Sequence, residues 1–446
     1  MEICTIGGYE QVGKNMTAVK VGEEVVIFDM GFHLPAVIEL QDESKQQVYS
    51  EKQLRRVGGI PEDRILDKLG WTDKVKAIVI GHAHLDHVAA APYIAYRYKN
   101  APIIATPFTM EVMNSLSQDE KIRIPNKQII LQPNATYQVP NSEMKIEFIH
   151  TTHSTIQCVF VALHTKEGIF FYALDFKFDN YPTLGAPPNY ARMKQIGDTK
   201  KVKAMVVDAL YSSTERKPGG ERIALNLLEE AFSKVQEEDS AFFITTFSSH
   251  IERLNNIVKL AKKTKRRIVF LGRSLNKYVF AAEKVGMCPF MNQIQMLKYR
   301  GQINSFLKRL NHERGKYIVV CTGHQAEDGS ILDRISKGKT PFMFKPGDNL
   351  IFSSSVIPVE PNIESRQKMD AKLRRMGVRL QTDVHVHGHG SRENLREILE
   401  LVRPEHVIPS HGTHEQEFPM LDLAKEFGYK VNQTSHLVSN GDLLKL

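Results

Sequence analysis

Four side chains that commonly bind metal ions lie within six residues of one another. They are His82, His84, Asp86 and His87, in the segment His-Ala-His-Leu-Asp-His. Imidazole nitrogen and carboxylate oxygen are the usual ligands of zinc and similar divalent ions. Ligands spaced at i, i+2, i+4 and i+5 cannot all reach one tetrahedral centre comfortably, so the spacing favours two adjacent ions. A polar loop with chance histidines is the weaker interpretation, because packing alone gives no reason for this composition.

The elements that must position these ligands are apolar strands. Residues 75–80 read Val-Lys-Ala-Ile-Val-Ile and run straight into the motif, which a helical pattern follows. Other strand-like apolar runs also end near histidine or aspartate: Asp29, His153, Asp175, Asp208 and His411. Functional groups gathered at one edge of a sheet show this pattern, because rigid strands fix the ligands while the loops adapt.

Length and composition indicate a globular protein of two or three domains. The chain has 446 residues, of which 42% are hydrophobic and 25% charged. No apolar run approaches the ~20 residues that span a bilayer, and the amino terminus resembles a strand rather than a signal peptide. The four cysteines are scattered without a CxxC pair, which favours buried free thiols in a reducing cytoplasm. A formal net charge of +8 favours an anionic partner.

Residues 8–15 nearly match the phosphate-binding P-loop, but that interpretation fails. Asn15 replaces the Ser or Thr that would hold magnesium, and residues 16–21 look like a strand rather than a helix. A β-hairpin is the better prediction.

From about residue 214 helices and strands alternate, which predicts a parallel α/β unit. We expect helices at 221–236, 249–262 and 274–285, and strands at 241–247, 267–271, 316–321 and 349–352. The strands end in small polar residues, including Ser248, Ser249, Arg273 and Ser274. Hydroxyl groups, backbone N–H groups and helix amino termini at the carboxyl ends of parallel strands bind phosphate well. Ordinary helix capping explains any single serine equally well.

Histidines return near the carboxyl terminus, in Val384-His385-Val386-His387-Gly388-His389-Gly390-Ser391 and at His411. HxHxDH with His153, Asp175 and His411 resembles the metallo-β-lactamase superfamily. Asp208, His389 and the α/β insertion resemble its β-CASP nucleases. Several segments are similar to the ribonuclease J family, of the archaeal type without the extra carboxy-terminal domain: Gly7-Gly8, Val12-Gly13-Lys14-Asn15-Met16, Thr246-Phe247-Ser248-Ser249-His250, Gly272-Arg273-Ser274, Cys321-Thr322-Gly323 and the 385–390 segment.

The resemblance implies an α/β fold, a metallo-β-lactamase αββα sandwich with an inserted β-CASP domain. We expect the sandwich at residues 1–213 and 363–446 and the insertion at 214–362. By the same resemblance, His82, His84 and His153 hold one metal, Asp86, His87 and His411 hold the other, and Asp175 bridges them. Asp29 and Asp208 would orient histidine ligands, and His389 and His385 would contact the scissile phosphate.

The implied activity is hydrolysis of RNA by two divalent ions, zinc or manganese, that lower the pKa of a shared water. The implied partner is single-stranded RNA, entered at a 5′ monophosphate and degraded 5′→3′, with endonuclease cleavage as a second mode. Residues implied to hold RNA or its phosphates are Ser248, Ser249, Arg273, Ser274, His385, His387, Gly388 and His389. His387 and His324 stand where the family usually has serine, so they bear on 5′-end preference. A cytoplasmic location and a homodimer are further expectations.

Three alternatives remain open at this point. A small-molecule hydrolase on the same core would cleave a thioester or lactone, a DNA-directed nuclease would use the same chemistry, and a non-catalytic scaffold would bind RNA without metal. The long insertion argues against the first and the complete ligand set against the third.

Overall fold

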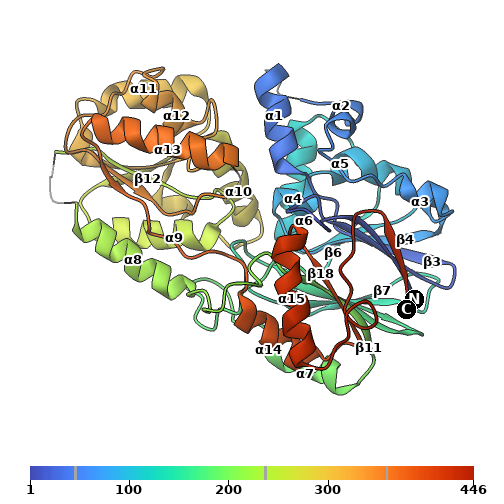
Figure 1. Ribbon diagram of the computed structural model, residues 1–446. Helices are drawn as coiled ribbons and strands as arrows, with labels where there is room; N and C mark the ends of the chain where they lie inside the picture. Colours follow the sequence, from blue (N-terminus) through green and yellow to red (C-terminus); the bar gives the residue numbers. More distant parts are fainter. Residues whose placement is uncertain (45–47, 236–238, 358–359) are drawn as a thin grey trace. The chain divides into compact units, whose positions relative to one another are not determined.

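The computed structural model describes residues 1–44, 48–235, 239–357 and 360–446. They form two compact units (Figure 1). The first unit contains Met1–Asn180, Pro187–Pro218 and Gly388–Leu446, and the second contains Tyr181–Ala186 and Gly219–His387. None of the helices that the structure describes has the length and hydropathy of a bilayer-spanning segment.

One sheet of the first unit has the strand order β19-β1-β2-β3-β4-β5-β6. Its strands are β1 (Glu2–Gly7), β2 (Met16–Val21), β3 (Glu24–Phe28), β4 (Val75–Ile80), β5 (Ile103–Ala105), β6 (Gln128–Ile130) and β19 (Asp442–Lys445). β1 and β2 pair antiparallel, so residues 8–15 link two strands of a hairpin and the P-loop interpretation is excluded.

The other sheet of the first unit has the order β18-β11-β10-β9-β8-β7. Its strands are β7 (Thr136–Gln138), β8 (Lys145–His150), β9 (Val159–Thr165), β10 (Gly168–Ala173), β11 (Val202–Asp208) and β18 (His406–Ser410). Alternate residues of both sheets, such as Val26 and Phe28 from β3 and Phe170 and Tyr172 from β10, share one buried cluster. The two sheets therefore pack face to face as a sandwich.

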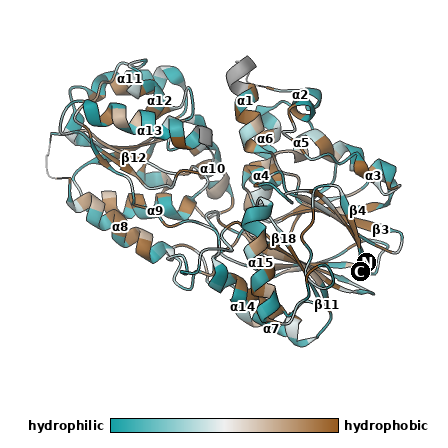
Figure 2. Ribbon diagram, in the orientation of Figure 1, coloured by the Kyte–Doolittle hydropathy of each residue, from teal (hydrophilic) through white to brown (hydrophobic). Residues whose placement is uncertain are grey.

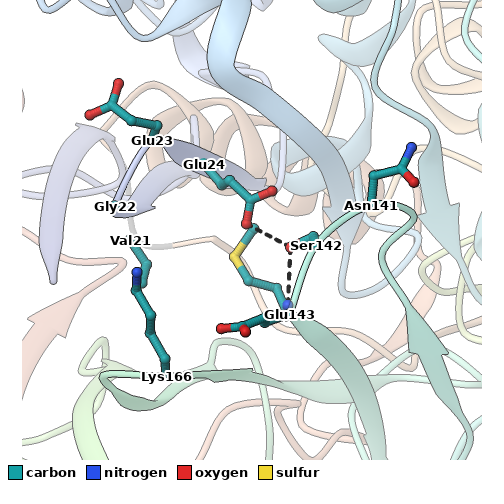
Figure 3. Close-up of a pocket in the computed structure, with 9 residues that line it drawn as sticks. Val21, Gly22, Glu23, Glu24, Asn141, Ser142, Glu143 and Lys166 are labelled. Atoms are coloured by element: carbon teal, nitrogen blue, oxygen red, sulfur yellow. Dashed lines mark hydrogen bonds between the residues drawn. The ribbon is translucent and has the colours of Figure 1, made fainter.

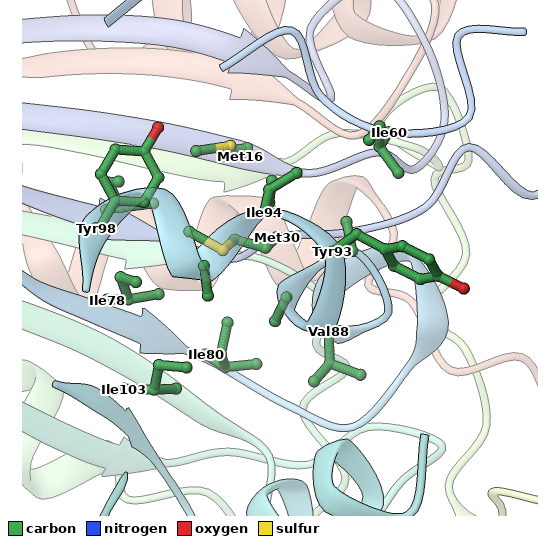
Figure 4. Packing of buried hydrophobic residues seen from close by; sticks show 14 of the residues in the cluster. Met16, Met30, Ile60, Ile78, Ile80, Val88, Tyr93, Ile94, Tyr98 and Ile103 are labelled. Atoms are coloured by element: carbon green, nitrogen blue, oxygen red, sulfur yellow. The ribbon is translucent and has the colours of Figure 1, made fainter. Parts of the chain in front are cut away.

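Helices cover the outer faces of this sandwich, which confirms the predicted αββα architecture. On the first sheet lie α1 (Leu34–Ser44), α2 (Glu51–Arg56), α3 (Ile65–Lys68), α4 (Leu85–Val88), α5 (Ala91–Ile94) and α6 (Pro107–Asp119). Figure 4 shows Ile78, Ile80 and Ile103 of the strands packed against Val88 and Ile94. Burial of each such side chain contributes roughly 1.5–3 kcal/mol. The second sheet is covered by α7 (Tyr190–Asp198), α14 (Arg392–Val402) and α15 (His414–Glu426), whose apolar residues share a buried cluster with its strands. Hydrophobic and hydrophilic residues are interspersed along α14 and α15 (Figure 2).

The second unit is built on a parallel sheet with the order β14-β13-β15-β12-β16-β17. Its strands are β12 (Phe242–Thr245), β13 (Arg267–Leu271), β14 (Gln295–Leu297), β15 (Tyr317–Cys321), β16 (Asn349–Phe352) and β17 (Arg379–Gln381). Its helices are α8 (Glu221–Ser233), α9 (Ile251–Ala261), α10 (Arg273–Lys284), α11 (Arg300–Leu310), α12 (Ile331–Ser336) and α13 (Glu360–Arg375). The predicted helix end at Gln236 lies outside the described residues.

The second unit extends beyond the boundary that we expected at residue 362. β17 pairs parallel with β16, and Met369 and Leu373 of α13 belong to the hydrophobic core of this unit. Residues 363–387 therefore belong to the second unit by packing, and the chain returns to the sandwich at Gly388.

Candidate metal centre

The candidate ligands follow strand ends on one edge of each sheet of the sandwich. β3 and β4 are parallel, so Asp29 and the His82 turn lie at the same edge. In the other sheet, β10, β11 and β18 are parallel, and β8 runs with β10 because both are antiparallel to β9. The side chains at or just after these ends are His153, Asp175, Asp208 and His411.

One group of ligand atoms comes from His82, His84, His153 and Asp175, all within 4.8 Å of one another. His153 Nε2 lies 2.9 Å from His84 Nδ1 and 3.5 Å from Asp175 Oδ2. Nδ1 of His153 donates to the main-chain oxygen of Gly388 at 2.7 Å. This hydrogen bond fixes the ring and leaves Nε2 facing the group.

A second group consists of Asp86, His87, His411 and the same Asp175, again within 4.8 Å. His87 Nδ1 donates to Asp29 Oδ2 at 2.7 Å, and its Nε2 lies 3.3 Å from Asp175 Oδ2. His411 Nε2 lies 3.8 Å from Asp86 Oδ2. Asp175 therefore stands between two groups, the position that a bridging ligand requires.

His389 and Asp208 lie beside both groups. His389 Nδ1 is 2.7 Å from Asp208 Oδ2, and its Nε2 is 4.0 Å from Asp175 Oδ2. Asp208 accepts from His389 Nδ1 through Oδ2 and from the N–H of Leu210 at 3.0 Å through Oδ1. That it orients a metal ligand stays a prediction. The rings of His153 and His411 lie 5.0 and 5.3 Å from the His389 ring.

Charge differs sharply between the two groups. Burial and the other histidines hold the pKa values of His82, His84 and His153 below their ordinary range, so these rings are neutral donors. Burial lowers the pKa of His87 as well, but the carboxylates of Asp175, Asp86 and Asp29 outweigh it and hold this pKa well above its usual value. The surroundings of His87 therefore stabilise positive charge on this ring.

The donor set fits a pair of divalent cations. His82 Nε2 and Asp175 Oδ1 are buried and make no hydrogen bond within the described residues. An unpaired buried polar atom costs about 1–3 kcal/mol. Imidazole nitrogens with shared carboxylate oxygen are suitable ligands for zinc or manganese, and a cation between these atoms would satisfy both unpaired acceptors.

The backbone around the groups is unusual. Asp29, Asp175 and His411 have φ values of 59°, 50° and 66°, a region that non-glycine residues rarely occupy. Gly31 must be glycine, because a Cβ there would lie 1.6 Å from the main-chain oxygen of Asp86. Tertiary contacts, rather than the backbone preferences of these residues, therefore fix the conformation of the ligand-bearing loops.

The predicted phosphate-binding residues lie mostly in the second unit. Ser248 and Ser249 follow β12, and Arg273 and Ser274 begin α10 after β13, with the last two exposed. His385 accepts a 3.2 Å hydrogen bond from Arg253, whose buried guanidinium also pairs with Glu221. His387 belongs to the same unit, so its role and that of His385 toward the metal groups remain predictions.

Sequence reasoning missed one residue of the centre. Asn15 is fully buried, and its side chain contacts His87 and His411. In the sequence, Asn15 belongs to the Gly13-Lys14-Asn15 segment that is similar to the family. That similarity did not predict a function for its side chain.

A pocket elsewhere in the first unit is not part of this centre. It is lined by residues such as Glu24, Met144 and Lys166 (Figure 3). Glu24 begins β3, and Met144 and Lys166 precede β8 and β10, so the pocket lies at the opposite ends of the strands whose carboxyl ends carry the ligands.

Three family models match the chain. Residues 10–170 match the metallo-beta-lactamase superfamily, residues 239–368 match the beta-CASP domain of ribonuclease J, and residues 375–432 match the Zn-dependent metallo-hydrolase RNA specificity domain. A crystal structure of a protein of unknown function from Enterococcus faecalis V583 has a TM-score of 0.64 at 16% identity, covering 100% of this chain and 99% of that one. This likeness supports the fold alone.

Curated relatives match over the whole chain. Ribonuclease J of Methanocaldococcus jannaschii is 37% identical, with 100% of this chain and 98% of the relative covered. Ribonuclease J of Pyrococcus abyssi is 36% identical, with 100% and 97% covered. Ribonuclease J 1 of Streptococcus pyogenes is 27% identical, with 100% and 74% covered. Together with the αββα sandwich, its α/β insertion and the clustered ligands, these matches show that the chain belongs to the ribonuclease J family.

Proposed function

We propose that this chain is a metal-dependent ribonuclease that hydrolyses the phosphodiester bonds of single-stranded RNA from the 5′ end. The observation that carries the proposal is the pair of ligand groups that share Asp175. One ion would be held by His82, His84 and His153, the other by Asp86, His87 and His411, and Asp175 would serve both. Two divalent ions held by these groups would supply an activated water and neutralise charge that develops on the phosphate.

Protein groups around the ions have separate tasks in this proposal. Asp29 orients His87 through the 2.7 Å hydrogen bond to Nδ1. Asp208 holds His389 in the same way, so that Nε2 of His389 points to the side of the centre where Asp175 lies. His389 Nε2 would donate a hydrogen bond to an oxygen of the scissile phosphate.

RNA is favoured as the substrate by the matches. One matched model describes an RNA specificity domain, and the relatives are named as ribonucleases. In the second unit, Ser248, Ser249, Arg273 and Ser274 lie at carboxyl ends of parallel strands, where phosphate binds well. These residues, with His385, His387 and Gly388, would hold the RNA backbone and its 5′ monophosphate.

The proposal also includes the identity of the metal, a cytoplasmic location and a homodimer. Zinc is the favoured ion, since the donors are histidine and carboxylate and a matched model describes a Zn-dependent hydrolase. The four cysteines are free and buried, which supports a cytoplasmic location. Light scattering on the purified chain tests homodimerisation.

Digestion of labelled nucleic acids tests the proposal. One RNA is prepared with a 5′ label, in monophosphate and triphosphate forms, beside DNA of the same sequence and a short thioester. Early release of mononucleotides from the monophosphate RNA supports 5′→3′ exonuclease action. Cleavage of the thioester without cleavage of RNA would overturn the ribonuclease proposal, and preference for DNA would change its substrate.

A further inference from the structure

Asn15 is held beside the second ligand group by its own main chain. Its main-chain N–H donates to the main-chain oxygen of Asp86 at 3.0 Å, and its main-chain oxygen accepts from the N–H of Gly31 at 3.1 Å. Gly8 leaves room for the amide, because a Cβ at Gly8 would lie 2.3 Å from Asn15 Oδ1. The side chain is therefore fixed in direction before any ligand binds.

The Asn15 amide contacts three of the four residues in the second group. Nδ2 donates to the main-chain oxygen of Asp86 at 3.1 Å, and it lies 3.0 Å from His87 Nε2 and 2.9 Å from His411 Nδ1. Oδ1 lies 3.2 Å from His411 Nδ1. One neutral group thus spans the two imidazoles that come from distant parts of the chain.

The contact involves the nitrogen of His87 that is left for an ion. Nδ1 of this ring is occupied by Asp29, whereas Nε2 faces both Asp175 and the Asn15 amide. The amide nitrogen, which lies at His87 Nε2, can only donate, whereas the amide oxygen, which lies near His411 Nδ1, can accept from an imidazole N–H. Being uncharged, the amide does not repel a cation.

We propose that Asn15 is a positioning residue for the second ion: its amide holds the His87 and His411 rings apart and directed toward Asp175, so that the ion meets a preformed site. The inference rests on the two-ion centre of the proposed function. Loss of a group that orients metal ligands typically weakens metal affinity by about 10–100-fold.

The test is calorimetric titration of the metal-free chain with zinc, together with metal analysis of the loaded protein. Wild type is expected to bind two ions. Asn15→Ala is expected to bind the first ion with unchanged affinity and the second about 10–100-fold more weakly. Asn126→Ala is the matched control, because Asn126 is also buried in the first unit. Among the described residues it donates only to the main-chain oxygens of Tyr98 and Ala101. Both ion affinities of this variant should stay unchanged.

Asn15→Asp keeps the experiment decisive where Asn15→Ala does not fold. The carboxylate preserves the size of the side chain and places negative charge beside the ion, so affinity for the second ion should rise. Unchanged affinity for the second ion in these variants would overturn the inference and leave the proposed function intact. Fewer than two ions in wild type would instead overturn the two-ion centre itself.

Discussion

Among single residues, Asp175 connects the most groups of the centre. Burial raises the pKa of its carboxyl, but the neighbouring His411, His87 and His389 outweigh burial and hold the pKa well below its ordinary value. A carboxylate that stays ionised while buried is suited to share cations between two sets of histidines.

Replacing a ligand with alanine should abolish cleavage without preventing RNA binding. In Asp86→Ala and in His84→Ala one group loses a donor atom, whereas the second unit, which carries most of the proposed phosphate contacts, is unchanged. Cleavage of labelled RNA and fluorescence anisotropy measure the two properties. Asp119→Ala, at the exposed end of α6, is the control and should cleave normally. Turnover retained by either ligand variant would refute the assignment of these ligands.

His389→Ala should lower kcat more than RNA affinity. A contact that strengthens in the transition state acts on kcat, and removal of one such donor costs about 10²–10³-fold. Single-turnover cleavage and equilibrium binding separate the two effects. Equal losses in both would make His389 a substrate-binding residue instead.

At the scale of elements, Glu147 ties the second sheet to a covering helix. Glu147 of β8 pairs with His164 of β9 at 2.7 Å and with Arg192 of α7 at 2.6 Å. Burial raises the pKa of Glu147, but these partners outweigh it and lower the pKa to about 2 from 4.5. Because the folded pKa is depressed, the stabilisation is present above pH 4.5 and is lost as the pH falls toward 2.

Glu147→Gln should therefore destabilise the fold at neutral pH by about 2 kcal/mol, less than the full pKa shift implies because solvent screens the partly exposed His164 and Arg192. It should also remove this part of the acid sensitivity. Thermal unfolding between pH 7 and pH 2 measures both. Glu143→Gln, on the exposed turn before β8, serves as the control. A variant as stable as wild type at pH 7, with the same loss in acid, would show that the ion pairs contribute nothing.

Elements with strong apolar patterns were predictable, and weakly patterned edge strands were not. The run at 75–80 matches β4, and the helix–strand alternation after residue 214 predicted the parallel sheet. β17 and β19 were missed because their residues are at most half-buried, and main-chain hydrogen bonds to one neighbour hold them in place. No local pattern encodes such pairing.

The residues of the metal centre also divide into those that a local sequence pattern predicts and those that it does not. The spacing of His82, His84, Asp86 and His87 indicated two ions directly, whereas the assignment of His153 and His411 to particular ions came from the family resemblance. Asn15 has no motif chemistry of its own, and its role depends on a loop that only the folded chain brings to His411.

For the whole molecule, the net charge of +8 and the phosphate-suited strand ends of the second unit predict salt-dependent RNA binding. Counterion release should weaken RNA affinity by at least about 10-fold between 50 and 200 mM salt. Anisotropy with the non-cleaving Asp86→Ala variant measures this without loss of substrate. Affinity independent of salt would argue against contacts with the RNA backbone.

The central claim is that the two ligand groups hold two ions that RNA cleavage requires. Elemental analysis of the purified chain, with RNA cleavage measured on the same samples, tests it most directly. The account predicts two ions per wild-type chain, and fewer ions with no cleavage in Asp175→Ala, because both groups lose a donor. Cleavage by a chain that holds no ion, or an Asp175→Ala variant that keeps both ions and full activity, would contradict it.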